Sequence, residues 1–219
     1  MLKRMLAVSA LCLVLTGSSA SADVSAVFPP SSKPLGDSYS TWAERWGKYA
    51  FGFPNGENPL IFASDCSISL QAHGGAWLLP ASGGGKQVVD CPVEANQPLL
   101  LTPGGNQGVV GINGKDRAAT RQYVRESMRG TDSLFVSIDG DRVPTIGQFR
   151  THTGFFNIYI HKHNIVGATQ PGTYQMKIAG WFVMLRALAP GDHTIIAHDV
   201  FPSSSGPVSA TTRYKLHVG

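Results

Sequence analysis

Two histidines, His161 and His163, end the run FFNIYIHKH at residues 155–163. Alternate side chains of a β-strand share a face, so this pair would point the same way as Asn157 and Tyr159. Two imidazoles on one strand face can bind a transition metal such as zinc, with Zn–N distances of about 2.0–2.1 Å. The stretch is therefore either half of a metal site or the solvated face of a strand, and its sequence leaves both interpretations open.

A metal site needs further ligands, and His193, His198 and Asp199 are candidates. On a regular strand, however, His193 and His198 would lie on opposite faces. The H-x-H pair is similar to half of a cupin metal motif, but the glutamate and glycines that should follow it are replaced by Asn-Ile-Val-Gly at 164–167. We expect no cofactor, with a divalent transition metal bound by His161 and His163 as the alternative.

Other catalytic signatures are missing from the sequence. It has no G-x-S-x-G nucleophile elbow and no H-E-x-x-H zinc motif, and GGGK at 83–86 lacks the Walker spacing. A glycosidase needs two facing carboxylates, but no pair stands out, and the sequence SIDGDRV uses Asp139 and Asp141 in a turn. The catalytic residues are therefore unknown, and the sequence leaves open whether the protein is an enzyme, with a non-catalytic role favoured.

Arginines recur every four residues within 116–129: Arg117, Arg121, Arg125 and Arg129. On a helix this spacing drifts by only about 40° per step, so the four form one basic ridge opposite a narrow apolar face. The ridge is either a solvated face partly neutralised by Asp116 and Glu126 or a site for an anionic envelope component, such as an acidic glycan or a phospholipid head group. Together with the polar strand face, it gives these candidate binding residues: Arg117, Arg121, Arg125, Asn157, Tyr159 and His161.

The clearest helix expected is 38–50, which begins the folded domain. At 100° per residue, one arc of about 120° collects six side chains: Tyr39, Trp42, Ala43, Trp46, Tyr49 and Ala50. Thr41 with Glu44 could form a capping box, or Asp37 could cap the helix one turn earlier. An aromatic stripe of this kind can be a sugar platform, but buried packing on a sheet is the favoured interpretation.

The rest of the chain reads as short strands between turns. Asp139-Gly140 predicts a tight hairpin, and Pro171-Gly172 and Pro190-Gly191 predict reversals. We therefore expect a mainly β fold, a jelly-roll-like or immunoglobulin-like β-sandwich with one N-terminal and one mid-chain helix. The expected strands are 76–81, 86–90, 98–102, 133–139, 155–163, 173–179, 181–188, 193–200 and 211–218.

The N-terminus is typical of a signal peptide, with Lys3 and Arg4 before an apolar stretch and Ala-Ser-Ala at 20–22. Cleavage near Ala22 would leave an irregular segment at 23–36, a single β-sandwich domain at 37–219 and no transmembrane segment. Loss of Lys3 and Arg4 from the 18 basic residues leaves 16 against 14 acidic ones, so nucleic acid is an unfavourable partner. We expect a secreted, extracellular or periplasmic protein.

Cys66 and Cys91 are the two cysteines that remain after cleavage. An even count in an exported chain predicts one disulfide rather than two free thiols or a zinc site. It would close a loop of about 25 residues and stabilise the fold by roughly 3 kcal/mol in the loop-entropy model.

Several segments carry a resemblance to a family: YSTWAERWGKYAFGFPNGENPL, AWLLP, SIDG, GWFVML and LAPGDHTI. In this order they resemble an uncharacterised family of exported, β-rich bacterial proteins. The resemblance implies a secreted β-rich domain that begins with an aromatic helix, and it implies no activity. His193 falls in the P-G-x-H-T-I turn of that pattern, where a turn-stabilising role is expected.

These observations favour an exported binding or interaction module whose ligand is a cell-envelope or environmental glycan, an acidic one if the arginine ridge contributes to binding. Two alternatives stay open. One is a metal-dependent hydrolase that uses His161 and His163, and the other is a structural envelope protein that binds a partner through free Trp42 and Trp46 surface. The oligomeric state is unknown.

Overall fold

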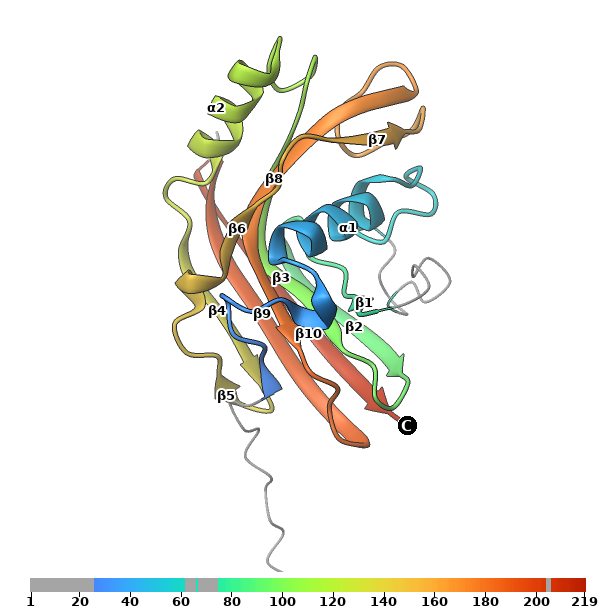
Figure 1. Ribbon diagram of the computed structural model, residues 1–219, viewed down its shortest axis with the longest axis vertical. Coiled ribbons are helices and arrows are strands. Elements are labelled where there is room, and N and C mark those ends of the chain that lie inside the picture. Colours follow the sequence, from blue (N-terminus) through green and yellow to red (C-terminus); the bar gives the residue numbers. More distant parts are fainter. Residues whose placement is uncertain (1–25, 62–65, 67–74, 204–205) are drawn as a thin grey trace, which may run out of the picture.

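The computed structural model describes residues 26–61, 66, 75–203 and 206–219. The expected signal peptide at 1–22 lies outside these residues. Within them the protein is mainly β, with two α-helices and two mixed sheets in a sandwich-like arrangement (Figure 1). The mainly β fold class with two helices is confirmed.

The first sheet is built around the long strand β8 (Gly172–Leu185). Its order is β1 (Trp77–Leu78), β3 (Leu99–Val109), β8 and β6 (Arg150–His152). Strand β7 (Phe156–Ile160) also pairs with β8, beyond β6 along the same strand. All these pairings are antiparallel except β1 with β3.

The second sheet has the order β2 (Gly85–Val93), β10 (Gly206–Val218), β9 (Gly191–Ser203), β4 (Asp132–Ile138) and β5 (Asp141–Arg142). Only β2 with β10 is parallel. Asp139 and Gly140 form the β4–β5 hairpin turn, both with positive φ, as the sequence predicts. His193 holds this turn to the start of β9, because its Nδ1 lies 2.7 Å from an Asp139 carboxylate oxygen.

Helix α1 (Tyr39–Phe51) buries its aromatic stripe, as predicted. The indole nitrogen of Trp42 donates to the Pro34 carbonyl and that of Trp46 to the Leu79 carbonyl, each over 2.9 Å. Each buried indole N–H therefore has a hydrogen-bond acceptor in the folded protein, in place of water. Only 2% of Trp42 and 6% of Trp46 is exposed, so the stripe offers no free partner surface of the kind the structural-protein alternative invokes.

The expected start of α1 is wrong in detail. Ser38 is the N-cap, and its hydroxyl accepts a hydrogen bond from the Thr41 backbone N–H. Asp37 instead pairs with Arg45 over 2.7 Å, and Glu44 pairs with Lys48. Both acids that the sequence offered as caps or capping-box partners are thus engaged with cations on the exposed face of the helix.

Several strand boundaries also differ from expectation. Segments 173–179 and 181–188 form the single strand β8, and β3 runs on past 102 to Val109. Gly105 and Gly180 lie opposite each other, and a Cβ on Gly180 would stand 2.8 Å from the Gly104 carbonyl oxygen. These glycines therefore mark a close backbone approach rather than a break between strands. The short strands β5 and β6 were not expected.

The disulfide between Cys66 and Cys91 is confirmed, with a Cα–Cα distance of 5.3 Å. Both cysteines are fully buried. Among the described residues, no helix is long and apolar enough to cross a membrane.

Candidate functional site

Helix α2 (Arg117–Ser127) presents the arginine ridge. The Asp116 side chain caps it by accepting a hydrogen bond from the Ala119 N–H at 2.9 Å. The narrow buried face, Thr120 and Val124, packs on β3 at Gly108, where an added Cβ would stand 2.6 Å from a Val124 methyl. The helix therefore lies on the sheet by a thin apolar contact and leaves its arginines exposed, as the sequence predicts.

Three cations converge on the ring of Phe155, which lies in the short link between β6 and β7. The guanidinium carbons of Arg117 and Arg121 lie 5.4 and 5.9 Å from the ring centroid, and the Lys177 ammonium lies 5.9 Å from it. Lys177 comes from β8 and donates to the Thr153 carbonyl. Its pKa is lowered by burial and by the positive charge of Arg121.

No carboxylate of the described residues forms an ion pair with this cluster. Their ion pairs lie elsewhere and include none of the three cations. The two acids nearest in sequence have other partners: Asp116 caps the helix, and Glu126 accepts from the Gln122 amide over 2.8 Å. Neither acid therefore forms an ion pair with the three cations, and partial neutralisation of the ridge by Asp116 and Glu126 stays a prediction.

Polar side chains continue from the cations along the same face of β8 and β7. Arg117 Nε donates to the Gln175 side-chain carbonyl over 2.7 Å, and Gln175 lies directly opposite Asn157 in the strand pair. Tyr159 follows two residues later on this face and is 53% exposed. We call this surface the basic face; its members are Arg117, Arg121, Phe155, Asn157, Tyr159, Gln175 and Lys177.

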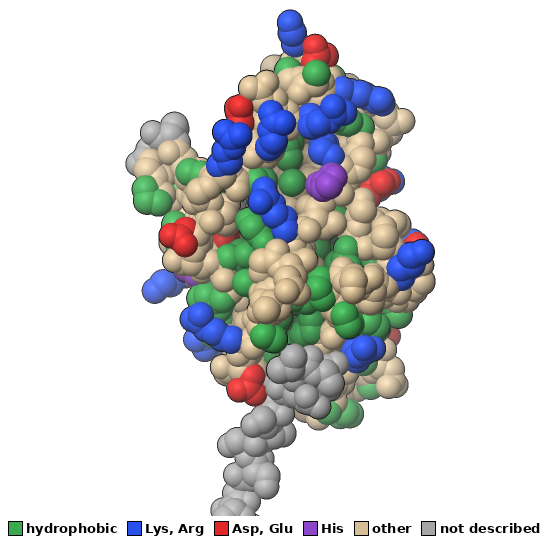
Figure 2. All heavy atoms as spheres, turned by 60° about the vertical axis from the view of Figure 1, so that its left-hand side comes forward, with side chains coloured by type: hydrophobic (Ala, Val, Ile, Leu, Met, Phe, Trp, Pro, Cys, Tyr) green, Lys and Arg blue, Asp and Glu red, His purple; other side chains and the backbone are tan. Residues whose placement is uncertain are grey.

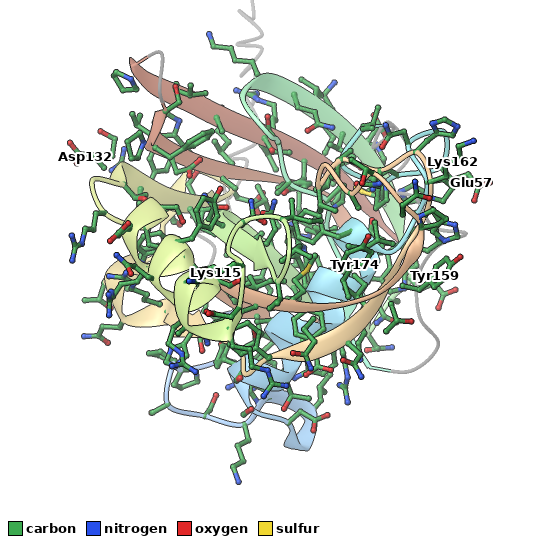
Figure 3. The ribbon with its side chains drawn as sticks, turned by 90° about the horizontal axis from the view of Figure 1, so that it is seen from above. Glu57, Lys115, Asp132, Tyr159, Lys162 and Tyr174 are labelled. Atoms are coloured by element: carbon green, nitrogen blue, oxygen red, sulfur yellow. A yellow bond between two sulfur atoms is a disulfide. The ribbon has the colours of Figure 1, made fainter. Side chains whose placement is uncertain are left out.

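Figure 2 shows Lys and Arg side chains gathered at the upper end of the molecule, where α2 lies. In the view from above, Tyr159 lies away from α2, toward the edge that carries Lys162 and Glu57 (Figure 3). The basic face is thus elongated, with its cations at one end and an exposed aromatic ring at the other. The His161 ring stands edge-on to Tyr159 with a centroid distance of 5.1 Å.

The structure places the candidate binding residues along one side of the molecule. Arg117 and Arg121 reach the β7–β8 surface directly, and Arg125 continues the exposed ridge one helical turn further on. Arg129 lies beyond the end of α2. Sequence reasoning missed Phe155, Gln175 and Lys177. The alternation in YQMKI would have placed Gln175 and Lys177 on one strand face, but nothing local indicates that α2 packs beside them.

The expectation that His161 and His163 share a strand face is wrong. Strand β7 ends at Ile160, and the following loop is held by Asn164, whose side-chain amide donates to the carbonyls of His161 and Ala168 over 2.9 Å each. Over the part of the chain that the structure describes, no group of three or more His, Cys, Asp or Glu side chains is placed to hold a metal ion.

The other proposed metal ligands have separate surroundings. His193 lies between Asp139 and the Ala189 carbonyl, in the turn-stabilising position that the resemblance implies. His198 contacts the Thr211 hydroxyl at 2.8 Å, on the opposite face of β9. Asp199 is 4% exposed and points toward β3, against Gly104.

Comparison with known proteins gives little further guidance. The sequence matches no protein-family model, and it matches no curated protein. One similar solved structure is "Structure of PbICP-C in complex with falcipain-2", with 12% identity, a TM-score of 0.26, and coverage of 67% of this chain and 100% of that chain. Another is "Solution Structure of Amebosin", with 11% identity, a TM-score of 0.18, and coverage of 61% and 96%. Similarities this low carry no functional argument.

Proposed function

We propose that this protein is a non-catalytic binding module that works outside the cytoplasm and recognises an acidic glycan through the basic face. The observation that carries the proposal is the convergence of Arg117, Arg121 and Lys177 on Phe155 without an ion pair to any carboxylate of the described residues. Holding three cations together costs free energy through mutual repulsion, and a bound anion removes that cost.

The chemistry around the cations favours a sugar acid over a simple inorganic anion. A guanidinium pairs well with a carboxylate, as on a uronic acid residue. Gln175 and Asn157 provide amides for hydroxyl groups, and the exposed ring of Tyr159 provides an apolar surface for a sugar ring. The Cys66–Cys91 disulfide fits an oxidising compartment outside the cytoplasm, where such glycans occur.

The test uses polygalacturonate, a polymer of uronic acid, and its methyl-esterified form, which keeps the sugar backbone but lacks the negative charge. We expect the protein to bind the first and not the second in isothermal titration calorimetry. The Arg117→Gln/Arg121→Gln variant should bind polygalacturonate about tenfold more weakly, a loss of about 1.4 kcal/mol. The Arg213→Gln/Lys215→Gln variant removes the same charge from exposed positions on β10 and should bind like the unmodified protein.

Two further measurements decide whether a glycan is the ligand class. Tyr159→Ala should weaken polygalacturonate binding without changing the dependence on salt, because it removes ring contact and no charge. Inorganic polyphosphate should bind more weakly than polygalacturonate of equal charge. Equal binding of polyphosphate, or equal losses in the α2 and β10 variants, would refute a specific acidic-glycan site on this face.

A further inference from the structure

A second feature, separate from the basic face, is a cavity of about 470 Å³. Its walls come from α1, β3, β8, β9 and the end of α2, together with the segment after α1, residues 81–83 and Ile165. They are mostly apolar. The aromatic and aliphatic wall residues include Trp46, Phe51, Leu60, Met128, Ile178 and Phe182. A space of this size with apolar walls is of the kind that holds a small organic molecule.

Strand β3 makes room for the cavity by a bulge. Its pairing with β8 shifts register between Leu101 and Gly104, so Thr102 and Pro103 leave the regular ladder and line the space. Gly104 then brings bare backbone against Asp199, since a Cβ at this position would overlap one of the carboxylate oxygens. The absence of a side chain at 104 therefore allows a carboxyl group to be placed in an apolar wall.

Asp199 has an unusual environment for a carboxyl group. The residue is 4% exposed, and no hydrogen bond or ion pair to its carboxyl group is seen among the described residues. Burial raises its pKa to about 7. It is also the only ionisable side chain among the described cavity-lining residues from α1, α2, β3, β8 and β9. The next ionisable residue on β9, His198, points to the other face, toward Thr211 and Phe135.

We propose that this cavity binds a small, largely apolar primary amine, whose ammonium group pairs with the Asp199 carboxylate while its hydrocarbon body contacts the apolar walls. An ionised carboxylate only accepts hydrogen bonds, and in a wall without cations it lacks the counter-charge that a buried ion needs. An ammonium supplies both the charge and the donors. A neutral ligand of the same shape would gain the apolar contacts alone.

The pairing has a defined pH dependence. An aliphatic ammonium keeps its proton up to about pH 10, whereas Asp199 must lose its own proton before the two can pair. Each amine that binds below about pH 7 therefore releases one proton. The dissociation constant should fall about tenfold for each unit rise between about pH 5 and pH 7 and then become constant.

The experiment measures binding of four primary amines of different shape to residues 23–219 by isothermal titration calorimetry. The probes are butylamine, cyclohexylamine, 2-phenylethylamine and tryptamine, and tryptophol is the uncharged match for tryptamine. We expect at least one amine to bind with the stated pH dependence. If tryptamine binds, tryptophol should bind at least tenfold more weakly than tryptamine, and its dissociation constant should not depend on pH. Binding should release one proton near pH 6, measured by repeating the titration in buffers of different ionisation enthalpy.

Two variants locate the site. Asp199→Asn keeps the shape of the side chain and should abolish the pH dependence and the preference for amine over alcohol. Thr131 is a half-buried loop residue that lines the cavity, and Thr131→Trp should fill part of the cavity. This variant should bind the amine more weakly although the Asp199 carboxyl is kept. Circular dichroism establishes that each variant is folded. No amine binding tighter than about 1 mM, or unchanged amine preference in Asp199→Asn, would overturn the proposal.

Discussion

Replacing Asp199 by asparagine should change how the stability of the protein depends on pH. In the folded protein burial raises the pKa of this carboxyl to about 7, from an ordinary value of 3.8. Between these two values the folded chain keeps a proton that the unfolded chain has lost. Raising the pH through this range therefore favours unfolding, and the asparagine side chain has no proton that titrates in this way.

The magnitude follows from the two pKa values. Each pH unit in this range lowers the free energy of unfolding by about 1.4 kcal/mol, so the carboxyl accounts for a loss of about 4 kcal/mol between pH 4 and pH 8. The residue is 4% exposed and its carboxyl lines the cavity, so about 4 kcal/mol is the upper end of the expected loss. A loss of this size is a large part of the roughly 5–15 kcal/mol that stabilises a typical domain.

The assay is urea unfolding of the protein and of Asp199→Asn at intervals from pH 4 to pH 8, followed by tryptophan fluorescence. We expect the free energy of unfolding to fall by about 4 kcal/mol more in the unmodified protein than in the variant. Asp141→Asn, the same substitution at an exposed position on β5, serves as the matched control and should follow the unmodified profile. Parallel profiles for Asp199→Asn and the unmodified protein would refute the reasoning, because they would mean that the carboxyl is hydrated or paired in solution.

Three further outcomes are expected. Replacing Cys66 and Cys91 together by serine should lower the free energy of unfolding in urea by about 3 kcal/mol, and a reductant should bring the unmodified protein to the same value while leaving the variant unchanged. Gly104→Ala should destabilise the fold by about 1–3 kcal/mol because the new Cβ overlaps Asp199. In an Asp199→Ala background the same substitution should destabilise the fold less, as measured by a double-mutant cycle. An equal loss of stability in both backgrounds would mean that backbone strain is the cause. Burial alone lowers the pKa of His193, but its hydrogen bonds to a carboxylate and a carbonyl raise it overall. The stability that this group contributes is therefore present below about pH 6.5 and is lost as the pH rises through the folded-state pKa. His193→Gln should flatten the pH profile of the free energy of unfolding in that window, and an unaltered profile would contradict the assignment.

Local sequence patterns were sufficient to predict those parts of the structure that depend mainly on residues close together in the chain. The stripe of helix α1 was predicted correctly because residues three and four apart share a helical face whatever they pack against. The turn at Asp139-Gly140 was predicted because positive φ is needed at both positions and these residue types tolerate it. The disulfide followed from the count of cysteines in a chain expected to be exported.

The sequence was insufficient to predict the structure where segments far apart in the chain contact each other. Strand β3 runs through TPGGNQGV, which reads locally as a loop, because Gly104 and Gly105 allow a close backbone approach to Gly180 in the middle of β8. The loop at 161–168 interrupts the expected strand because the Asn164 side chain bonds to backbone groups of this loop. Asp199 was one of several carboxylates in the sequence, and only the bulge in β3 distinguishes it.

The two proposed sites can be tested separately because strand β8 divides them. Lys177 belongs to the basic face, and the next residue, Ile178, lines the cavity, since successive side chains of a strand point to opposite faces. Helix α2 is the element common to both, with Arg117 and Arg121 on the basic face and Met128, just after its last turn, in the cavity wall. If α2 stays in place, Arg117→Gln/Arg121→Gln should leave amine binding unchanged, and Asp199→Asn should leave polygalacturonate binding unchanged. A loss of both activities in either variant would mean that the position of α2 couples the sites, and hydrogen exchange of the α2 backbone amides would then show the helix to be less protected in that variant.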